Sequence, residues 1–459
     1  MPRLMAAALL GLFLVPAARG WRAAGGLRAK SALAARSALE GYSFAQYIRD
    51  FSRPYSPGSE EHQRRAAIFE ASLAEVHTTN ARNAKEGRGW KAGIHPFMDW
   101  TLAERRVLNG YKPPRGHRHS QAVALLHEGA SAFGRSSMAS RLNASFSEEG
   151  GLSADMGPAL RQQGNCGSCW AISAVEAVEA QLLRSGAPPS TRLSAQALVD
   201  CVPNPQHCGG SGGCDGATGE LAYAFMRDHG IPLESDLPYT ARTSTCPQVP
   251  LDGPWHSMRR ARVSGWSQLP SNQAEPLKSA LVSQGPVVVA VDGNNWFNYD
   301  SGVFDSCEKD AILGHAVLAK GYGSDAGRSY WLIQNSWGSD WGENGHIRML
   351  MHDDEEQWCG VDRKPQEGVG CDGGPAEVTV CGMCGILYDP VVPQGVRLEG
   401  IDSATDDEGL GSGVAQAEGS DTATAVAGNL DEASPGASAG SGVNAEAQMD
   451  ALLRNFSNS

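Results

Sequence analysis

Hydrophobic and polar positions in the first quarter of the chain repeat with the period of a helix. Residues 43–85 contain a single turn signal, PYSPG at 54–58, and the run that follows it has neither Pro nor Gly. Within that run, one set of residues recurs at steps of three and four, which places the set along one stripe of a helix. The stripe consists of Glu61, Arg65, Ile68, Phe69, Ser72, Val76 and Asn80. Spacing alone predicts an ordinary amphipathic helix.

The pattern changes between residues 156 and 393, where Gly, Trp and Cys are frequent. A helical run over residues 170–184 ends at Ser185 and Gly186, which are typical of a helix terminus. Strand-like runs such as PVVVAV at 286–291 come later. Helices first and strands afterwards predict an α+β domain with two segregated lobes.

Two stretches lack a pattern that could bury a core. Residues 112–150 are rich in Ser, Ala and Gly, which predicts an exposed linker, with Asn143 as a candidate glycosylation site. Beyond Pro393 the chain consists mainly of Gly, Ala, Ser, Asp and Glu. Residues 397–459 hold 11 acidic and 2 basic residues and so carry −9 of the net charge of −13. This composition predicts a disordered acidic tail.

The chain begins with the features of a secretory signal peptide. Arg3 precedes an apolar run at residues 4–15, and small residues follow at 17–20. The run is too short to span a bilayer, so we expect a cleaved signal and no membrane anchor. The acidic charge argues against a nucleic-acid partner.

Eleven cysteines in an oxidising compartment predict disulfides, and the odd count leaves at least one thiol unpaired. The string QQGNCGSCWAISA at 162–174 raises the question of whether Cys166 or Cys169 is the reactive one. A redox pair would need a thioredoxin-like βαβ context, which is absent. A zinc site would need two further ligands, and Cys381 and Cys384 form the only second C-x-x-C.

Four residues together could perform nucleophilic catalysis. Cys169 directly precedes the predicted helix, whose positive end and free N–H groups favour a thiolate. His315 in GHAVLAKGYG opens an alternating apolar run and could accept the thiol proton. Asn335 could orient that imidazole, and Gln163 could donate an N–H to an oxyanion alongside the backbone N–H of Cys169. Each residue alone is more often structural or on the surface.

The strings QGNCGSCW, GHAV and NSWGSDWGENG resemble the papain/cathepsin family of cysteine proteases. The resemblance covers about residues 43–393 and implies that Cys169 is the nucleophile, His315 the general base and acid, and Asn335 the orienting residue. It further implies that Gln163 is the oxyanion-hole donor and that Trp337 shields the Asn–His hydrogen bond. The separation of 146 residues between Cys169 and His315 falls within the range of roughly 130–150 typical of the family.

The helical stripe gains a second interpretation from this resemblance. The positions from Glu61 to Asn80 are similar to the family's inhibitory propeptide signature, with Ser72 in place of the usual Asn. Residues 93–99, GIHPFMD, are similar to the shorter propeptide motif, with His95 where Asn is usual. Both favour a cathepsin L-type zymogen whose prodomain lies through the active-site cleft.

Some disulfides are implied in the same way. The family pattern implies Cys166–Cys214 and Cys201–Cys246, which leaves Cys169 free. Cys307–Cys384 is favoured, and Cys307–Cys359 stays open. Residues 352–381 are an insertion relative to the family, and no place in the fold is predicted for them.

The sequence departs from the family pattern in three places. Ala217 replaces the second glycine after Cys214-Asp-Gly216, along the substrate backbone. Gly314 precedes His315 where Asp or Asn is common, and the usual Asp-Trp-Arg near the mature start is missing. Aligned through Cys384, Asp389 falls at the floor of the S2 pocket, where a carboxylate would favour a basic P2 residue. The alternative interpretation is that the side chain of Asp389 points to solvent.

The expected protein is therefore a cysteine endopeptidase made as a zymogen, of lysosome- or vacuole-like or extracellular location, with peptide or protein substrates. We expect a monomer without metal or organic cofactor. The expected fold is papain-like α+β, with a helical lobe and a β-barrel-like lobe. The predicted segments are a signal peptide (1–20), a linker (21–42), an inhibitory prodomain (43–111), an activation linker (112–150), the peptidase domain (151–394) and the tail (395–459).

Two alternatives remain. A non-catalytic binding protein could use the same fold, although the intact set of four residues argues against it. A dipeptidyl peptidase or carboxypeptidase would need an extra segment that blocks the cleft, and the insertion at 352–381 is the unplaced one.

Overall fold

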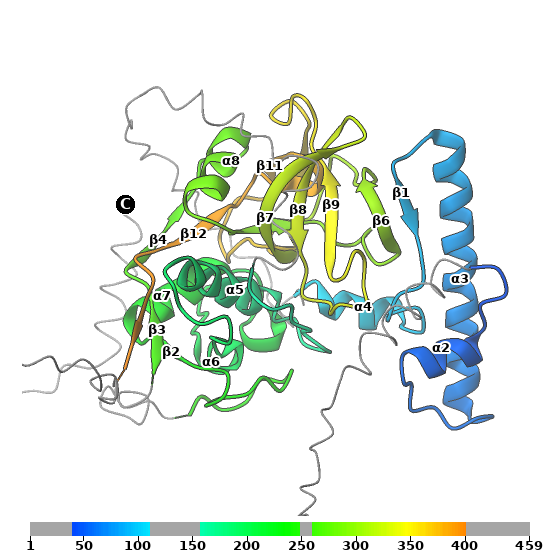
Figure 1. Cartoon of the computed structure of the whole chain (residues 1–459), viewed down its shortest axis with the longest axis horizontal. Helices are drawn as coiled ribbons and strands as arrows, with labels where there is room; N and C mark the ends of the chain where they lie inside the picture. Colours follow the sequence, from blue (N-terminus) through cyan, green and yellow to red (C-terminus); the bar gives the residue numbers. More distant parts are fainter. Residues whose placement is uncertain (1–38, 111–156, 248–258, 401–459) are drawn as a thin grey trace, which may run out of the picture.

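The computed structural model describes residues 39–110, 157–247 and 259–400 (Figure 1). The expected signal peptide, the activation linker with Asn143, and residues 401–459 of the expected tail lie outside these ranges. Among the described residues, no helix has the length and apolar character needed to cross a membrane.

The N-terminal unit, residues 39–110, contains three helices and one strand. They are α2 (Phe44–Asp50), α3 (Glu60–Glu86), β1 (Trp90–Ala92) and α4 (Leu102–Leu108). Ser43, Ser59 and Thr101 cap the three helices, because each side chain accepts a hydrogen bond from a backbone N–H in the first turn. Helix α3 ends where Gly87 takes a left-handed conformation at φ 66°. The predicted stripe therefore lies on one 27-residue helix.

The helical lobe is built around α5 (Cys169–Arg184), which is buried along almost its whole length. Helices α6 (Ala195–Cys201) and α7 (Gly219–Asp228) pack against it, and the short η1 (Gly213–Asp215) lies between them in sequence. A small sheet completes the lobe, with strand order β13-β3-β2. Its strands are β2 (Ile231–Pro232), β3 (Arg260–Arg262) and β13 (Arg397–Glu399).

The sheet lobe holds an eight-stranded sheet in the order β1-β6-β9-β8-β7-β5-β12-β4. Its pairs are antiparallel except β6 with β9, and α8 packs against β7 and β5. The bounds are β4 (Gly265–Gln268), α8 (Ala274–Ser283), β5 (Val287–Val291), β6 (Tyr299–Phe304), β7 (His315–Asp325), β8 (Arg328–Gln334), β9 (His346–Leu350) and β12 (Val391–Gln394).

The N-terminal unit is joined to the sheet lobe by backbone pairing. Strand β1 pairs antiparallel with β6, with Trp90 opposite Gly302, and so forms an edge of the large sheet. Figure 1 shows α3 running along the outer side of β1, away from the helical lobe. Buried side chains of both parts, such as Phe69 and Trp337, belong to one continuous hydrophobic core.

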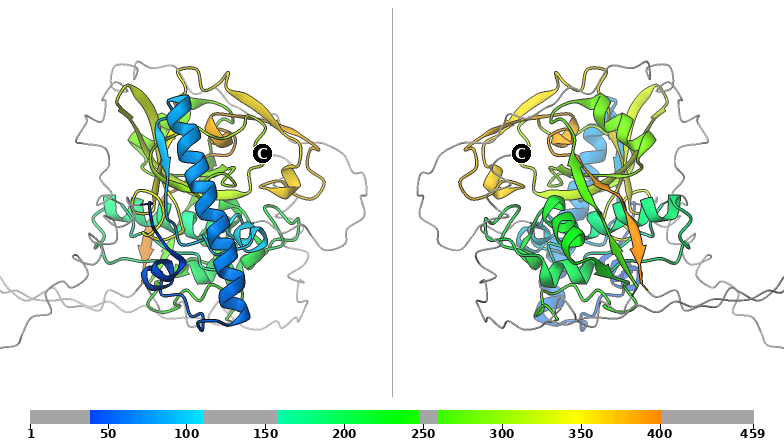
Figure 2. Two further views of the ribbon diagram at one scale, coloured as in Figure 1. Left: turned by 90° about the vertical axis from the view of Figure 1, so that its right-hand side faces the viewer. Right: turned by 90° about the vertical axis from the view of Figure 1, so that its left-hand side faces the viewer.

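The insertion forms an element of its own. It contains the hairpin β10 (Cys359–Asp362) and β11 (Val378–Cys381), with η3 (Pro365–Glu367) between the strands, and η4 (Met383–Gly385) follows it. Figure 2 shows this yellow-orange segment descending from the sheet lobe toward loops of the helical lobe.

Five disulfides connect ten of the eleven cysteines, all of which are described, and Cys169 is free. The bridges Cys166–Cys214, Cys201–Cys246 and Cys307–Cys384 have the pairing implied by the sequence resemblance. Cys359 pairs with Cys381, so the alternative Cys307–Cys359 is absent, and Cys208 pairs with Cys371.

The folded region extends beyond residue 394, where the tail was expected to begin. Strand β13 continues it, because Arg397 pairs with Arg262 and Glu399 pairs with Arg260. Glu399 also forms salt bridges with the side chains of Arg260 and Arg262. The low apolar content of this region concealed a strand held by backbone pairing and charge.

Candidate active site

Cys169 lies at the first position of α5, one residue earlier than the helix start predicted from the sequence. Its side chain is buried, at 3% exposure. The backbone N–H of Ala316, on the neighbouring strand β7, donates to its Sγ at 3.5 Å. The thiol therefore lies where the start of the central helix meets the start of β7.

His315 and Asn335 meet because β7 and β8 are antiparallel neighbours. His315 begins β7, and Asn335 follows the last residue of β8. The His315 ring donates from Nε2 to Asn335 Oδ1 at 2.9 Å, which leaves Nδ1 of the neutral ring as a proton acceptor. The indole of Trp337 stacks on the imidazole, with 5.1 Å between ring centroids. Trp337 thus covers one face of the His315 ring.

Gln163 has its amide fixed from both sides. Its Oε1 accepts a hydrogen bond from Ser336 Oγ at 2.6 Å, so the Nε2 group points the other way. Nε2 donates to the carbonyl oxygens of Leu108 at 2.9 Å and Cys166 at 2.8 Å. Sequence reasoning missed Ser336, although its position next to Asn335 was a usable signal.

The backbone of the N-terminal unit occupies the space in front of these groups. The Leu108 carbonyl lies at the Gln163 amide, where a reacting carbonyl oxygen would be stabilised. Gly110 lies against the thiol, since a Cβ added to it would be 2.9 Å from Cys169 Sγ. A Cβ on Gly216 would be 1.8 Å from the Gly110 carbonyl oxygen, so only glycine fits there. Residues 108–110 were not singled out from the sequence, because contact with the site depends on long-range packing.

Burial opposes ionisation of the thiol in this form of the protein. It raises the pKa of Cys169 to about 11, although backbone N–H groups of Ala316, Trp170 and Cys169 oppose the shift. Burial also lowers the pKa of His315 to about 4, against the opposing effects of the hydrogen bond to Asn335 and of the nearby Leu108 backbone. In the covered site, burial therefore opposes the thiolate that the helix terminus favours.

The predicted substrate side holds a pair of carboxyl groups. Asp389 is 9% exposed, so it does not point to solvent, and Gln268 Nε2 donates to its Oδ1 at 2.7 Å. Burial and the nearby Glu220 carboxyl raise the pKa of Asp389 well above its usual range. Ala217 is buried, with its carbonyl close to Gly209. Sequence analysis did not identify Glu220, in the first turn of α7, as a partner of Asp389.

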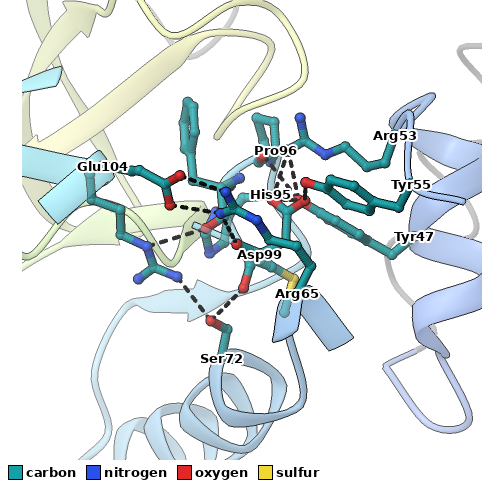
Figure 3. Close-up of polar contacts among 12 residues, drawn as sticks. Tyr47, Arg53, Tyr55, Arg65, Ser72, His95, Pro96, Asp99 and Glu104 are labelled. Atoms are coloured by element: carbon teal, nitrogen blue, oxygen red, sulfur yellow. Dashed lines mark hydrogen bonds and ion pairs between the residues drawn. The ribbon is translucent and has the colours of Figure 1, made fainter. Parts of the chain in front are cut away.

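A polar cluster organises the N-terminal unit (Figure 3). The buried carboxylate of Asp99 accepts hydrogen bonds from Tyr47 at 2.8 Å and Tyr55 at 2.5 Å, and Arg53 lies 3.1 Å away. Arg65 donates to both oxygens of Glu104, at 2.7 and 2.6 Å, and so ties α3 to α4. Arg65, a residue of the propeptide-like stripe, therefore links helix α3 to helix α4.

The two motif departures fit their surroundings. Ser72 donates to the Met98 carbonyl at 2.8 Å and accepts from Arg105 at 2.9 Å. His95 contacts Asn298 of the sheet lobe, with 3.0 Å between Nε2 and Oδ1. Both polar groups therefore have partners despite their burial.

In the described part of the chain, no three His, Cys, Asp or Glu side chains gather in a way that could hold a metal ion. The second C-x-x-C is divided between two disulfides, Cys359–Cys381 and Cys307–Cys384.

Two family profiles match the chain. The papain family cysteine protease profile matches residues 155–369, and the cathepsin propeptide inhibitor domain (I29) matches residues 44–104. A cathepsin L-like proteinase of Fasciola hepatica is 30% identical over 69% of this chain and 89% of the relative. Cysteine endopeptidase RepA of Oryza sativa is 33% identical over 68% and 80%. The chain belongs to the papain family of cysteine proteases.

Solved structures have the same fold. Digestive procathepsin L 3 of Tenebrio molitor gives a TM-score of 0.55 at 27% identity, over 76% of this chain and 97% of that one. Among plant relatives, cysteine protease 1 of Oryza sativa is 38% identical over 63% of this chain, and the matched region spans 55% of that protein. The chain thus covers little more than half the length of that relative.

Proposed function

We propose that this protein is a cysteine endopeptidase made as a zymogen, with residues 39–110 as its inhibitory prodomain. The observation that supports it best is the position of the Leu108–Gly110 backbone. It lies between the free thiol of Cys169 and the amide of Gln163, where a substrate peptide would react. The prodomain in this position excludes both substrate and water.

The proposed reaction uses the chain's own residues. Once the cleft is open, His315 Nδ1 takes the Cys169 proton and the sulfur attacks the peptide carbonyl carbon. Gln163 Nε2 and the Cys169 backbone N–H donate to the oxyanion. The C–N bond breaks as the imidazolium protonates the leaving amine, which gives a thioester. His315 then deprotonates a water that attacks the thioester, releasing the carboxylic acid and the thiol.

The segments outside the described residues complete the proposal. A signal peptide at residues 1–20 would direct the chain to the secretory pathway, and one relative is a KDEL-tailed cysteine endopeptidase of Arabidopsis thaliana. Acid in a lysosome- or vacuole-like compartment would loosen the prodomain, and cleavage within residues 112–155 would release a monomeric peptidase.

The pocket at Asp389 is proposed to select the P2 residue. The carboxyl groups of Asp389 and Glu220 are neighbours, and Gln268 holds one oxygen of Asp389. A basic P2 side chain would be favoured once Asp389 is ionised.

Covalent labelling tests the function. The acid-processed protein is treated with an electrophilic peptide probe and compared with Cys169→Ala. We expect one label per molecule at Cys169, and no label or peptide cleavage in the variant. A folded, processed protein that takes no label and cleaves no peptide would overturn the proposal in favour of a binding protein.

A further inference from the structure

The insertion contains a segment that spans the cleft, residues 359–381, here called the strap. Its two ends are held together by the β10–β11 pairing and the Cys359–Cys381 disulfide. The residues between the strands are partly exposed, so the strap runs over the surface.

One end of the strap is fixed to the cleft wall that carries His315. The backbone N–H of Val361 donates to Asp310 Oδ1 at 2.8 Å, and that of Leu313 donates to Asp362 Oδ2 at 3.4 Å. Gly368 lies against Leu313, because a Cβ there would be 2.5 Å from the Leu313 carbonyl oxygen. Leu313 is two residues before His315.

The apex of the strap is fixed to the opposite wall. Cys371 forms a disulfide with Cys208, and the N–H of Gly209 donates to the Gly370 carbonyl at 3.2 Å. Asp372 N–H donates to the Gln206 carbonyl at 2.8 Å. Gly209 in turn lies against Ala217, since a Cβ on it would be 2.5 Å from the Ala217 carbonyl oxygen. The disulfide therefore joins the two lobes beside the substrate backbone position.

The underside of the strap is apolar. Val369 packs against a small cluster that contains Leu313 and Ala290 of β5, and Tyr388 packs on the same cluster. Tyr388 directly precedes Asp389 at the proposed S2 pocket. The strap thus roofs the region next to that pocket, where a substrate would extend from Cys169 toward its amino end.

We propose that the strap, locked by Cys208–Cys371, closes the amino-side end of the cleft and limits cleavage to bonds with only a few residues on that side. This inference rests on the proposed cysteine protease chemistry, and it narrows the proposed activity from general endopeptidase cleavage to cleavage near the amino ends of peptides. Moving the strap would expose Val369 and break the four hydrogen bonds to the two walls, and the disulfide keeps the apex on the helical lobe. Longer amino-side extensions would then have to bend away, losing contacts with the cleft.

A length series tests the strap. Fluorogenic peptides share one cleavable bond and carry two to six residues on its amino side, and a second series varies the carboxyl side. For the processed enzyme we expect kcat/KM to fall at least about tenfold beyond two or three amino-side residues, with no comparable effect of carboxyl-side length. If kcat/KM did not change with amino-side length, the proposed role of the strap would be overturned without the need for any variant.

Two double variants test whether the Cys208–Cys371 disulfide causes this dependence on amino-side length. Cys208→Ser with Cys371→Ser should restore cleavage of the long peptides to within a few-fold of the short ones. The matched control, Cys201→Ser with Cys246→Ser, removes a bridge inside the helical lobe and should keep the length dependence. Mass spectrometry after alkylation verifies which bridges remain under the assay reductant. An unchanged length dependence in the folded first variant would overturn the locking role. If no peptide were cleaved and the thiol took no label, the proposed protease function would instead be refuted.

Discussion

Two segments cover the cleft in this structure, and they are attached by different forces. The prodomain is held by side-chain packing, charge pairs and the β1–β6 pairing, with no disulfide to the rest of the chain. The strap is held by Cys208–Cys371. Noncovalent contacts respond to acid and to proteolysis, whereas a disulfide in an oxidising compartment does not. The comparison predicts a removable inhibitor and a permanent limit on substrate shape.

The largest expected effect is on the thiol itself when the prodomain leaves. With the site covered, burial raises the pKa of Cys169 to about 11, so almost no thiolate exists at pH 7. Uncovering the site should lower that pKa and speed iodoacetamide alkylation at pH 7 by at least about 100-fold. Alkylation rates measured against pH in precursor and processed protein check this, with Cys169→Ala as the blank. Equal rates in both forms would contradict the burial effect.

The packing that holds the prodomain is predicted to be sensitive to Phe69. This side chain is fully buried, with the rings of Phe44 and Tyr47 at 5.5 and 5.0 Å. Phe69→Ala should destabilise the prodomain by about 3–5 kcal/mol and expose the thiol to the peptide probe at neutral pH. Leu102→Ala, at a position 73% exposed on α4, is the control and should remain as resistant as the native precursor.

Acid should act through Glu104. Its hydrogen bonds with Arg65 and with Thr101 lower its pKa to about 2, so its contribution is complete above the ordinary carboxyl pKa and is lost as the pH falls from about 4.3 toward 2. Glu104→Gln should therefore speed self-processing at pH 5–6, by the equivalent of about 1 kcal/mol after solvent screening.

The control for that change is Glu60→Gln in the exposed first turn of α3. Time courses of precursor mass between pH 3 and 7 give the result. The gap between the curves of the native protein and of the Glu104→Gln variant should narrow toward the acid end. A constant gap between them at every pH would exclude protonation of Glu104 as the trigger.

The smallest effect is expected in P2 preference. Because the pKa of Asp389 is raised, its negative charge appears only as pH rises, and relative kcat/KM for Arg-Arg over Phe-Arg substrates should rise with it. Asp389→Asn should reduce the Arg-Arg rate about two- to threefold and remove this pH dependence, with Phe-Arg cleavage little changed. Exposed Asp236→Asn is the control. A clear preference for Phe at P2 at all pH values would contradict the proposal that Asp389 selects a basic P2 residue.

Local strings singled out candidate site residues that lie near one another in the fold. Cys169, His315, Asn335 and Gln163 lie in short motifs, and the structure brings the four into one cleft. The α+β class and the long helix α3 also followed from periodicity, because helical spacing is a property of neighbouring residues. The position of Asp389 depended on alignment through Cys384, whose disulfide with Cys307 is present.

Other features could not be read locally. Ser336, Glu220 and β13 gain their roles from partners that are more than 100 residues away in sequence. The pKa of the Cys169 thiol likewise depends on its burial beneath residues 108–110, which the local sequence does not reveal.

By itself, the sequence determined which side chains could do the chemistry and which segments could form helices or strands, since both are set by residue type and short-range spacing. Only the tertiary structure decided that residues 108–110 cover the thiol, that Cys208 finds Cys371, and that the insertion crosses from one lobe to the other. Those outcomes depend on how whole elements pack, and packing is chosen by burial and by backbone pairing over the entire chain.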